Sequence, residues 1–324
     1  MGAPSQSPAG VALMADFTRE LLDRPAVLAA STVALAYLDD AVAAATRLSD
    51  RSHTEALHDF RVAIRRLRVT VRAYPGLHES VSRKQRRRLR KLARATNPAR
   101  DAEVQLAWFV ERSPRFSTSE RAGLGPLRAR LRDRRRRVMA ATREDLQERF
   151  EKLERKLRRR LTTLRPDAGS HAAPFRAVAA TTLVQHASDL AGRLSDASPS
   201  ADPAELHATR IAAKRLRYLL EPVQSGLSDS ATLVRRLKDL QDLCGALTDA
   251  HELEVVLREA GEGAAPAANL LQAEVAALSI KLRDEWSTAG PDLERQIGAA
   301  ARQLRPARRR RWLRRAVVGD FTGG

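Results

Sequence analysis

The chain has 324 residues, with 58 Lys or Arg against 39 Asp or Glu, so its formal net charge at pH 7 is +19. Hydrophobic residues make up 43%, which excludes a disordered basic tail, and aromatic residues make up only 4%, which argues against a β-sandwich or barrel. A single cysteine, Cys244, excludes a disulfide framework and a cysteine zinc site. The charge predicts either a polyanionic partner or a highly solvated surface.

The first half has the apolar spacing of amphipathic helices. Helices are predicted over 27–48, over 58–74 and over 80–96, the last ending at Asn97-Pro98. Asp101 is expected to cap the next helix, which runs to about residue 111. From Ser119 to residue 164 the very basic sequence predicts one long helix, or two that are broken near 143–145.

The second half repeats this plan after a turn-rich segment at 165–174. Helices are predicted over 175–194, 204–220 and 228–243, and another begins with Asp249 as its cap and ends before Gly261. Two more are expected over 265–288 and 291–304. The prediction is an all-α protein with a flexible N-terminus (1–14), two helical halves (15–165 and 166–305) and a basic C-terminal tail (306–324).

The N-terminal residues lack the basic segment and long apolar core of a secretory signal. No uncharged apolar run approaches the 18 or so residues that a membrane span needs. We therefore expect a cytoplasmic protein that does not contact a membrane.

Two separate motifs are repeated at almost the same distance along the chain. LHDFRVAIRRLR (57–68) aligns without gaps to LHATRIAAKRLR (206–217), an offset of 149 residues from Leu57 to Leu206. RRLRKLARATNPARDA (87–102) aligns to RRLKDLQDLCGALTDA (235–250), which pairs Asp101 with Asp249 at an offset of 148. A nearly constant offset over two motifs indicates the internal duplication of one helical unit.

On a helical wheel the first motif separates into a cationic face and an apolar face. Phe60, Ile64, Leu67, Val71 and Tyr74 form the apolar face, which should pack into a bundle. Arg66 and its counterpart Arg215 lie apart from both faces. The cationic stripes comprise His58, Arg61, Arg65, Arg68 and Arg72 in the first motif and His207, Arg210, Lys214 and Arg217 in the second.

Like charges at this spacing repel each other by a few tenths of a kcal/mol per pair, so such stripes are not explained by helix stability. The helix after each motif adds more cations: Arg83, Arg87, Arg90 and Arg94 in the first half, and Arg235 and Lys238 in the second. Adjacent cationic helices predict a basic groove for a chain of phosphates.

At these residues the sequence resembles the CHAD family, the conserved histidine α-helical domain. The resemblance rests on the two L-H-x-x-R motifs and on the segments ending at Asp101 and Asp249, and covers roughly 15–305. It implies two four-helix-type bundles related by pseudo-twofold symmetry around a basic central cavity, which together form one CHAD domain. It also implies non-catalytic binding of inorganic polyphosphate and targeting to polyphosphate granules. His58, Arg61, Arg65, Arg66 and Arg68 would form the first binding motif, and His207, Arg210, Lys214, Arg215 and Arg217 the second.

The second half departs from the first at Asp239 and Asp242, which replace Lys91 and Arg94. Ligand contacts are therefore expected to be asymmetric. The basic stretch 128–160 and the tail residues Arg308–Arg311 either extend the binding track or are simply solvated.

The motif histidines allow three interpretations. Their neighbours are cationic arginines rather than the carboxylates or cysteines that ligate metal ions, so no metal or other cofactor is expected. They either close the first helical turn or donate to phosphate; in the latter case affinity should rise below pH 7. A Gly-rich phosphate loop and clustered carboxylates are missing from the sequence, so we expect no enzyme.

Sequence-independent binding of nucleic acid, or of polyanions in general, is the alternative function. The charge permits it, because phosphate contacts alone give affinity for any nucleic acid. Aromatic residues for base stacking are sparse, however, and Trp108, Trp286 and Trp312 lie away from the motifs.

Overall fold

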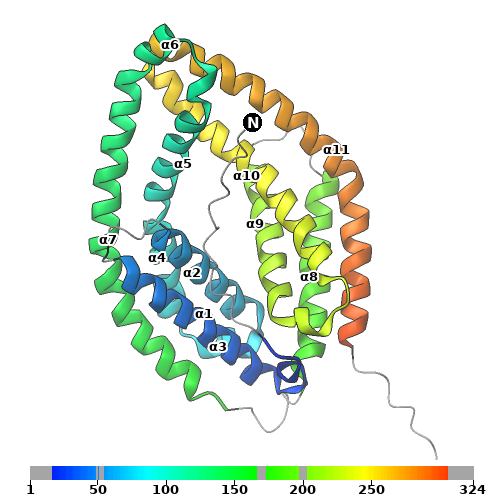
Figure 1. Cartoon of the computed structure of the whole chain (residues 1–324). Coiled ribbons are helices and arrows are strands. Elements are labelled where there is room, and N and C mark those ends of the chain that lie inside the picture. Colours follow the sequence, from blue (N-terminus) through cyan, green and yellow to red (C-terminus); the bar gives the residue numbers. More distant parts are fainter. Residues whose placement is uncertain (1–16, 49, 51–54, 166–172, 197–202, 306–324) are drawn as a thin grey trace, which may run out of the picture.

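The computed structural model describes residues 17–48, 50, 55–165, 173–196 and 203–305 (Figure 1). These residues form helices and contain no β-strand, which confirms the all-α prediction. The predictions for residues 1–14 and for the tail 306–324 fall outside this part of the chain.

Helix starts in the first half coincide with local signals. Ser82 opens α4 and Ser117 opens α6, each with a capping box in which the side chain accepts from the backbone N–H of Gln85 or Glu120. Pro75 lies in the first turn of α3, where its missing N–H costs nothing. The helices are α1 (Ala26–Leu48), α2 (Ala56–Ala73), α3 (Pro75–Ser80), α4 (Arg83–Ala95), α5 (Asn97–Arg112), α6 (Thr118–Gly123) and α7 (Gly125–Thr162).

The second half has fewer and longer helices. Gly261 has a φ of 74°, a conformation that favours glycine, and it ends the long helix that precedes it. The helices are α8 (Phe175–Asp196), α9 (Pro203–Leu220), α10 (Ser230–Ala260) and α11 (Ala265–Leu304).

Two predicted helix breaks are absent. The predicted break before Asp249 is wrong, because α10 runs through it with Leu247 and Leu253 both buried. The predicted break between 288 and 291 is also wrong: α11 continues past Pro291, since Leu293 keeps the helix packed on the core. In the first half, α7 is one helix through 143–145. Tertiary burial therefore overrides local helix-stop signals in these places.

The helices of the two halves pack in the same order. In the first half α1 packs on α2 and α7, and α4 packs on α2 and α7; in the second half α8 packs on α9 and α11, and α10 packs on α9 and α11. One hydrophobic core includes residues of both halves, such as Phe60 and Leu157 from the first and Leu216 and Leu237 from the second. The boundary predicted at 165/166 therefore separates two halves of the sequence, but both halves contribute to one continuous core.

A second, smaller core lies where the two halves meet away from α1 (Figure 1). There Trp108 and Phe109 of α5 and Leu127 of α7 are in one cluster with Leu257 of α10 and Leu271 of α11. The halves are therefore joined at both ends, which fixes α2 and α9 relative to each other.

Pro25 and Pro174 form an isolated antiparallel bridge between the starts of α1 and α8. The amide of Ala26 donates to the carbonyl of Ala173 (3.0 Å), and the amide of Phe175 donates to the carbonyl of Arg24 (2.9 Å). The two prolines are 149 residues apart, which is the offset of the first repeated motif. Residues that the repeat makes equivalent thus face one another here.

By length and composition, α1 is apolar enough to cross a membrane. In this structure it packs against α2, α7 and α8, and Val33, Ala34 and Leu38 are completely buried. A core helix of a globular protein has the same composition, so this finding leaves the expected lack of membrane contact a prediction.

Candidate functional site

The two faces predicted for α2 are both present. Phe60, Ile64, Leu67, Val71 and Tyr74 are buried, which confirms the apolar face. Of the cationic stripe, Arg65 and Arg68 are half-buried, and His58 and Arg72 are exposed. Burial and the neighbouring guanidinium of Arg65 lower the pKa of Arg68 to about 10.

Arg61 is the one residue of this stripe that is buried. Its Nη1 donates to the carbonyl oxygen of Thr96 and, over 2.7 Å, to the hydroxyl of Thr96, at the junction of α4 and α5. Burial, followed by the charge of Arg65, lowers the pKa of Arg61 to about 10. Arg61 therefore holds the helix junction, and its contact with ligand stays a prediction.

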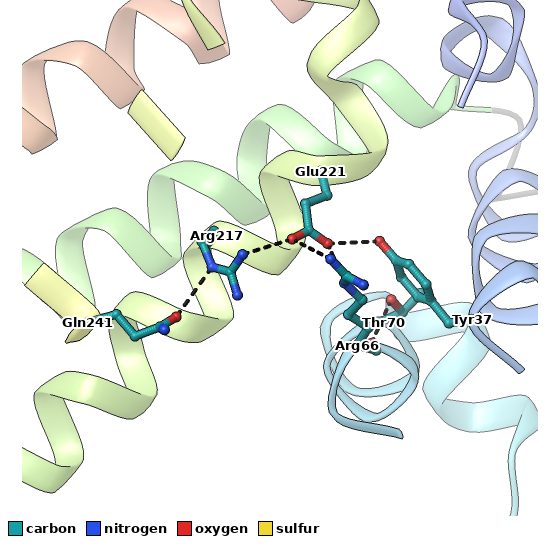
Figure 2. Close-up of polar contacts among 6 residues, drawn as sticks. All are labelled: Tyr37, Arg66, Thr70, Arg217, Glu221 and Gln241. Atoms are coloured by element: carbon teal, nitrogen blue, oxygen red, sulfur yellow. Dashed lines mark hydrogen bonds and ion pairs between the residues drawn. The ribbon is translucent and has the colours of Figure 1, made fainter. Parts of the chain in front are cut away.

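Arg66, which also lay in the predicted binding motif, is buried in an ion pair with Glu221 (Figure 2). Its Nε donates to Oε2 over 2.7 Å and its Nη2 to Oε1 over 3.2 Å. Glu221 also raises the pKa of Arg66 against the effect of burial. The structure thus uses Arg66 to join α2 to the end of α9, where sequence alone had suggested a ligand contact.

The stripe on α9 is half-buried at Arg210, Lys214 and Arg217 and exposed at His207. Lys214 is the most perturbed cation of the site. Burial, Arg210 and Arg65, in that order, lower its pKa to about 6, so the side chain is mostly the neutral amine at pH 7. Arg210 also has an Nε that is buried and lacks a hydrogen-bond partner in the described part of the chain.

Cations from the two halves act on one another. Arg65 of α2 lowers the pKa of Lys214 and of His207 on α9, and Arg215 of α9 contributes to the lowered pKa of Arg68. These residues lie far apart in sequence, and α2 packs against α9. The two stripes therefore lie close to each other, while the basic groove and the enclosed central cavity remain predictions.

The cations on the following helices are exposed, and only some lie near the stripes. Arg90 and Arg94 of α4 contribute to the lowered pKa of Arg68. Arg83 and Arg87 are exposed on the same helix, and so is Arg235 on α10. Lys238 is paired with Asp242 over 2.8 Å. The α10 side is thus partly neutralised, while the expected asymmetry of ligand contacts remains a prediction.

Asp101 and Asp249 are not helix caps, which corrects the prediction. Both lie inside helices, Asp101 in α5 and Asp249 in α10. Asp249 forms an ion pair of 3.5 Å with Arg210, and burial together with Asp249 raises the pKa of Asp101. The carboxylates instead provide local counter-charge for Arg61 and Arg210.

Both motif histidines have arginine neighbours, and His58 also lies near the carboxylates of Glu55 and Asp59. Burial and then Arg100 lower the pKa of His58, and burial and then Arg210 lower that of His207. Within the described ranges, no three His, Cys, Asp or Glu side chains are grouped as a metal ion requires. Cys244 is buried, as the sequence predicted, and burial raises its pKa to about 11.

A family model described as the CHAD domain matches residues 27–258, which include both cationic motifs. The chain belongs to the CHAD domain family. A crystal structure of the CHAD domain from the plant Ricinus communis superposes on it with a TM-score of 0.60 at 22% identity, covering 88% of this chain and 94% of that one. PptA from Streptomyces chartreusis gives a TM-score of 0.53 at 18% identity, covering 87% and 99%. Both likenesses concern the CHAD fold, and no curated protein sequence matches this CHAD chain.

Two residues of the site escaped the sequence analysis of this CHAD domain. Arg100 of α5 lies near His58 and Arg61, and His186 of α8 lies near Arg72 and Arg215. The offset of 149 pairs His186 with Tyr37 of α1, a different side chain, so the repeat by itself gave no signal for His186.

Proposed function

We propose that the chain binds inorganic polyphosphate, without converting it, along the converging stripes of α2 and α9. The observation that carries the proposal is the position of Lys214. The protein holds this lysine next to Arg65 and Arg210 at the cost of its charge, and the described residues provide no ion pair for Lys214 or Arg65. A ligand with closely spaced negative charges would relieve this repulsion.

Guanidinium groups and linked phosphates are well matched. A hydrogen bond to a charged group contributes roughly 1.5–3 kcal/mol, so several modest contacts give tight binding to a repeating polyanion. Half-buried arginines such as Arg65 and Arg68 keep donors available while their stems pack on protein. We further propose that the protein is cytoplasmic and associates with polyphosphate granules.

The distribution of aromatic residues favours a ligand without bases. Tyr37, Trp108 and Tyr218 are buried within the protein, so they offer no surface for base stacking. Binding of nucleic acid would then depend on backbone phosphates alone, and along each strand a sugar separates consecutive phosphates that polyphosphate links directly.

Competition distinguishes these two ligands. Labelled polyphosphate is bound at fixed salt and displaced by unlabelled polyphosphate, DNA or heparin at equal total charge. We expect polyphosphate to displace the label at a concentration at least tenfold lower. Equal displacement by all three would instead identify a general polyanion-binding protein.

A further inference from the structure

The repeat defines two equivalent groups of polar residues on helices that pack at or beside the α2–α9 contact. At the offset of 149, residues of α1 and α2 correspond to residues of α8 and α9, as the bridge between Pro25 and Pro174 also indicates. The first group is Tyr37, Arg66, Arg217 and Glu221, and the equivalent second group is His186, Arg215, Arg68 and Arg72.

In the first group the protein binds an oxyanion of its own. The buried carboxylate of Glu221 accepts from Arg66 (2.7 and 3.2 Å), from Nη1 of Arg217 (3.3 Å) and from the hydroxyl of Tyr37 (3.4 Å) (Figure 2). The guanidinium of Arg66 also lies 5.7 Å from the centre of the Tyr37 ring. This group is therefore closed by one internal negative charge.

In the second group that negative charge is missing, because Arg72 occupies the position equivalent to Glu221. Its residues nevertheless come from neighbouring helices, because α8 and α2 both pack against α9. After burial, Arg72 is the largest cause of the lowered pKa of Arg215, and Arg215 in turn affects the pKa values of Arg68 and His186. Within the part of the chain that the structure describes, no ion pair is formed by Arg68, Arg72 or Arg215.

The nearby acid does not fill the gap. Asp189 of α8 lies close enough to raise the pKa of Arg215 and of His186, but its Oδ1 is paired with Arg193 over 3.1 Å. The equivalent acid in the first group, Asp40, coexists with Glu221 rather than replacing it. The second group therefore has three guanidinium groups and an imidazole, with one carboxylate that is already shared.

We propose that Arg68, Arg72, Arg215 and His186 form a subsite for one phosphoryl group, which there takes the place that Glu221 fills in the first group. The subsite rests on the proposed function in that polyphosphate would supply the phosphoryl group, and it makes the binding track asymmetric. In the first group the carboxylate of Glu221 neutralises the arginines, and in the second group the phosphoryl group of the ligand would do so. Polyphosphate would accordingly be held more firmly on the α8 side.

The exchange Arg72→Glu tests the subsite, because it gives the second group the carboxylate that the first group has. Arg72 is exposed, so the variant should fold. Without ligand at low salt we expect a higher melting temperature than in the wild type, since the introduced carboxylate would pair with Arg215. Stabilisation by inorganic pyrophosphate should be lost, and affinity for polyphosphate should fall at least tenfold.

Arg283→Glu is the matched control, because it makes the same charge change at an exposed position of α11. It measures the loss of affinity that follows from net charge alone. If Arg72→Glu lowers the melting temperature, or weakens pyrophosphate and polyphosphate no more than the control does, the subsite is refuted. If wild-type protein binds pyrophosphate at this subsite but does not prefer polyphosphate in the competition experiment, the proposed function fails while the subsite stands.

Discussion

The guanidinium of Arg66 and the carboxylate of Glu221 are 155 positions apart in the chain, yet Nε and Oε2 lie 2.7 Å apart with both side chains about 95% buried. This ion pair connects α2 to the end of α9 and also draws in Tyr37 and Arg217 (Figure 2). It neutralises one side of an otherwise cationic helix contact, so the two halves can approach at that point.

Glu221→Gln should destabilise the protein strongly. Removal of one partner leaves Arg66 buried and uncompensated, which costs about 3–5 kcal/mol in comparable cases. Urea unfolding measures the change. Glu254→Gln, which removes an exposed pair with Arg258, is the control and should cost about 0–1 kcal/mol. Equal effects of the two substitutions would contradict a joining role for Glu221.

Arg61 and Arg65 should respond in opposite ways to replacement by alanine. Arg61→Ala removes a buried donor to Thr96 and should lower stability by about 1.5–3 kcal/mol. Arg65→Ala removes a cation with no described ion pair, so stability should be retained or increased. It should instead weaken polyphosphate binding and reduce its salt dependence by about one phosphate contact. Thermal unfolding and titrations at several salt concentrations separate these effects, and a fold lost in Arg65→Ala would show that this residue is structural.

Affinity for polyphosphate should increase as the pH falls from 8 to 5.5. The pKa of Lys214 is about 6, so this side chain gains a proton in this range, and the pKa values of His58 and His207 are lowered from their ordinary value. A bound polyanion favours the protonated forms, and proton uptake therefore accompanies binding. Calorimetry in two buffers of different ionisation enthalpy measures this uptake. Affinity that stays constant over the range at fixed salt would exclude a role for these groups.

Lys214→Met should stabilise the free protein at neutral pH. In the folded state the pKa of Lys214 is about 6, whereas an unfolded lysine has a pKa near 10.4. The unfolded state therefore binds more protons between these values, and the penalty from Lys214 is absent above pH 10.4 and complete below pH 6. The melting temperature of the variant should exceed that of the wild type at pH 7, by a margin that vanishes near pH 10. A margin independent of pH would indicate better packing instead.

Gly245→Ala tests how Arg210 is placed. An added Cβ would lie 3.2 Å from Nε and Nη2 of Arg210, so the guanidinium, which pairs with Asp249, would have to shift by a few tenths of an ångström. Gly192→Ala is the control, because its Cβ would meet no atom within 4 Å. Both exchanges add roughly 0.5–1 kcal/mol of helix stability, but only Gly245→Ala should weaken polyphosphate binding. Equal binding by the two variants would remove Arg210 from the ligand contact.

The helix predictions succeeded where one face of a segment is continuously apolar, and failed where a local signal competed with burial. In α2, the spacing of Phe60, Ile64 and Leu67 sufficed to predict the buried face. Asp249 carries the same local preference for a cap as any other aspartate, but α10 continues through it because Leu247 and Leu253 on either side are buried. The predicted break between 288 and 291 rests on local preferences around Pro291, whereas the burial of Leu293 and Ile297, which keeps α11 continuous, depends on contacts with distant residues.

The sequence by itself determined the helical class, the repeat and the rows of cations, because periodicity and charge are properties of neighbouring residues. Only the tertiary structure decided that Arg61 and Arg66 satisfy the protein's own oxygens while Arg65, Arg68 and Lys214 converge from two helices. Members of one cationic stripe are alike in sequence. What separates them is which carbonyl, carboxylate or cation the rest of the chain brings within a few ångströms, and that depends on contacts between residues more than a hundred positions apart.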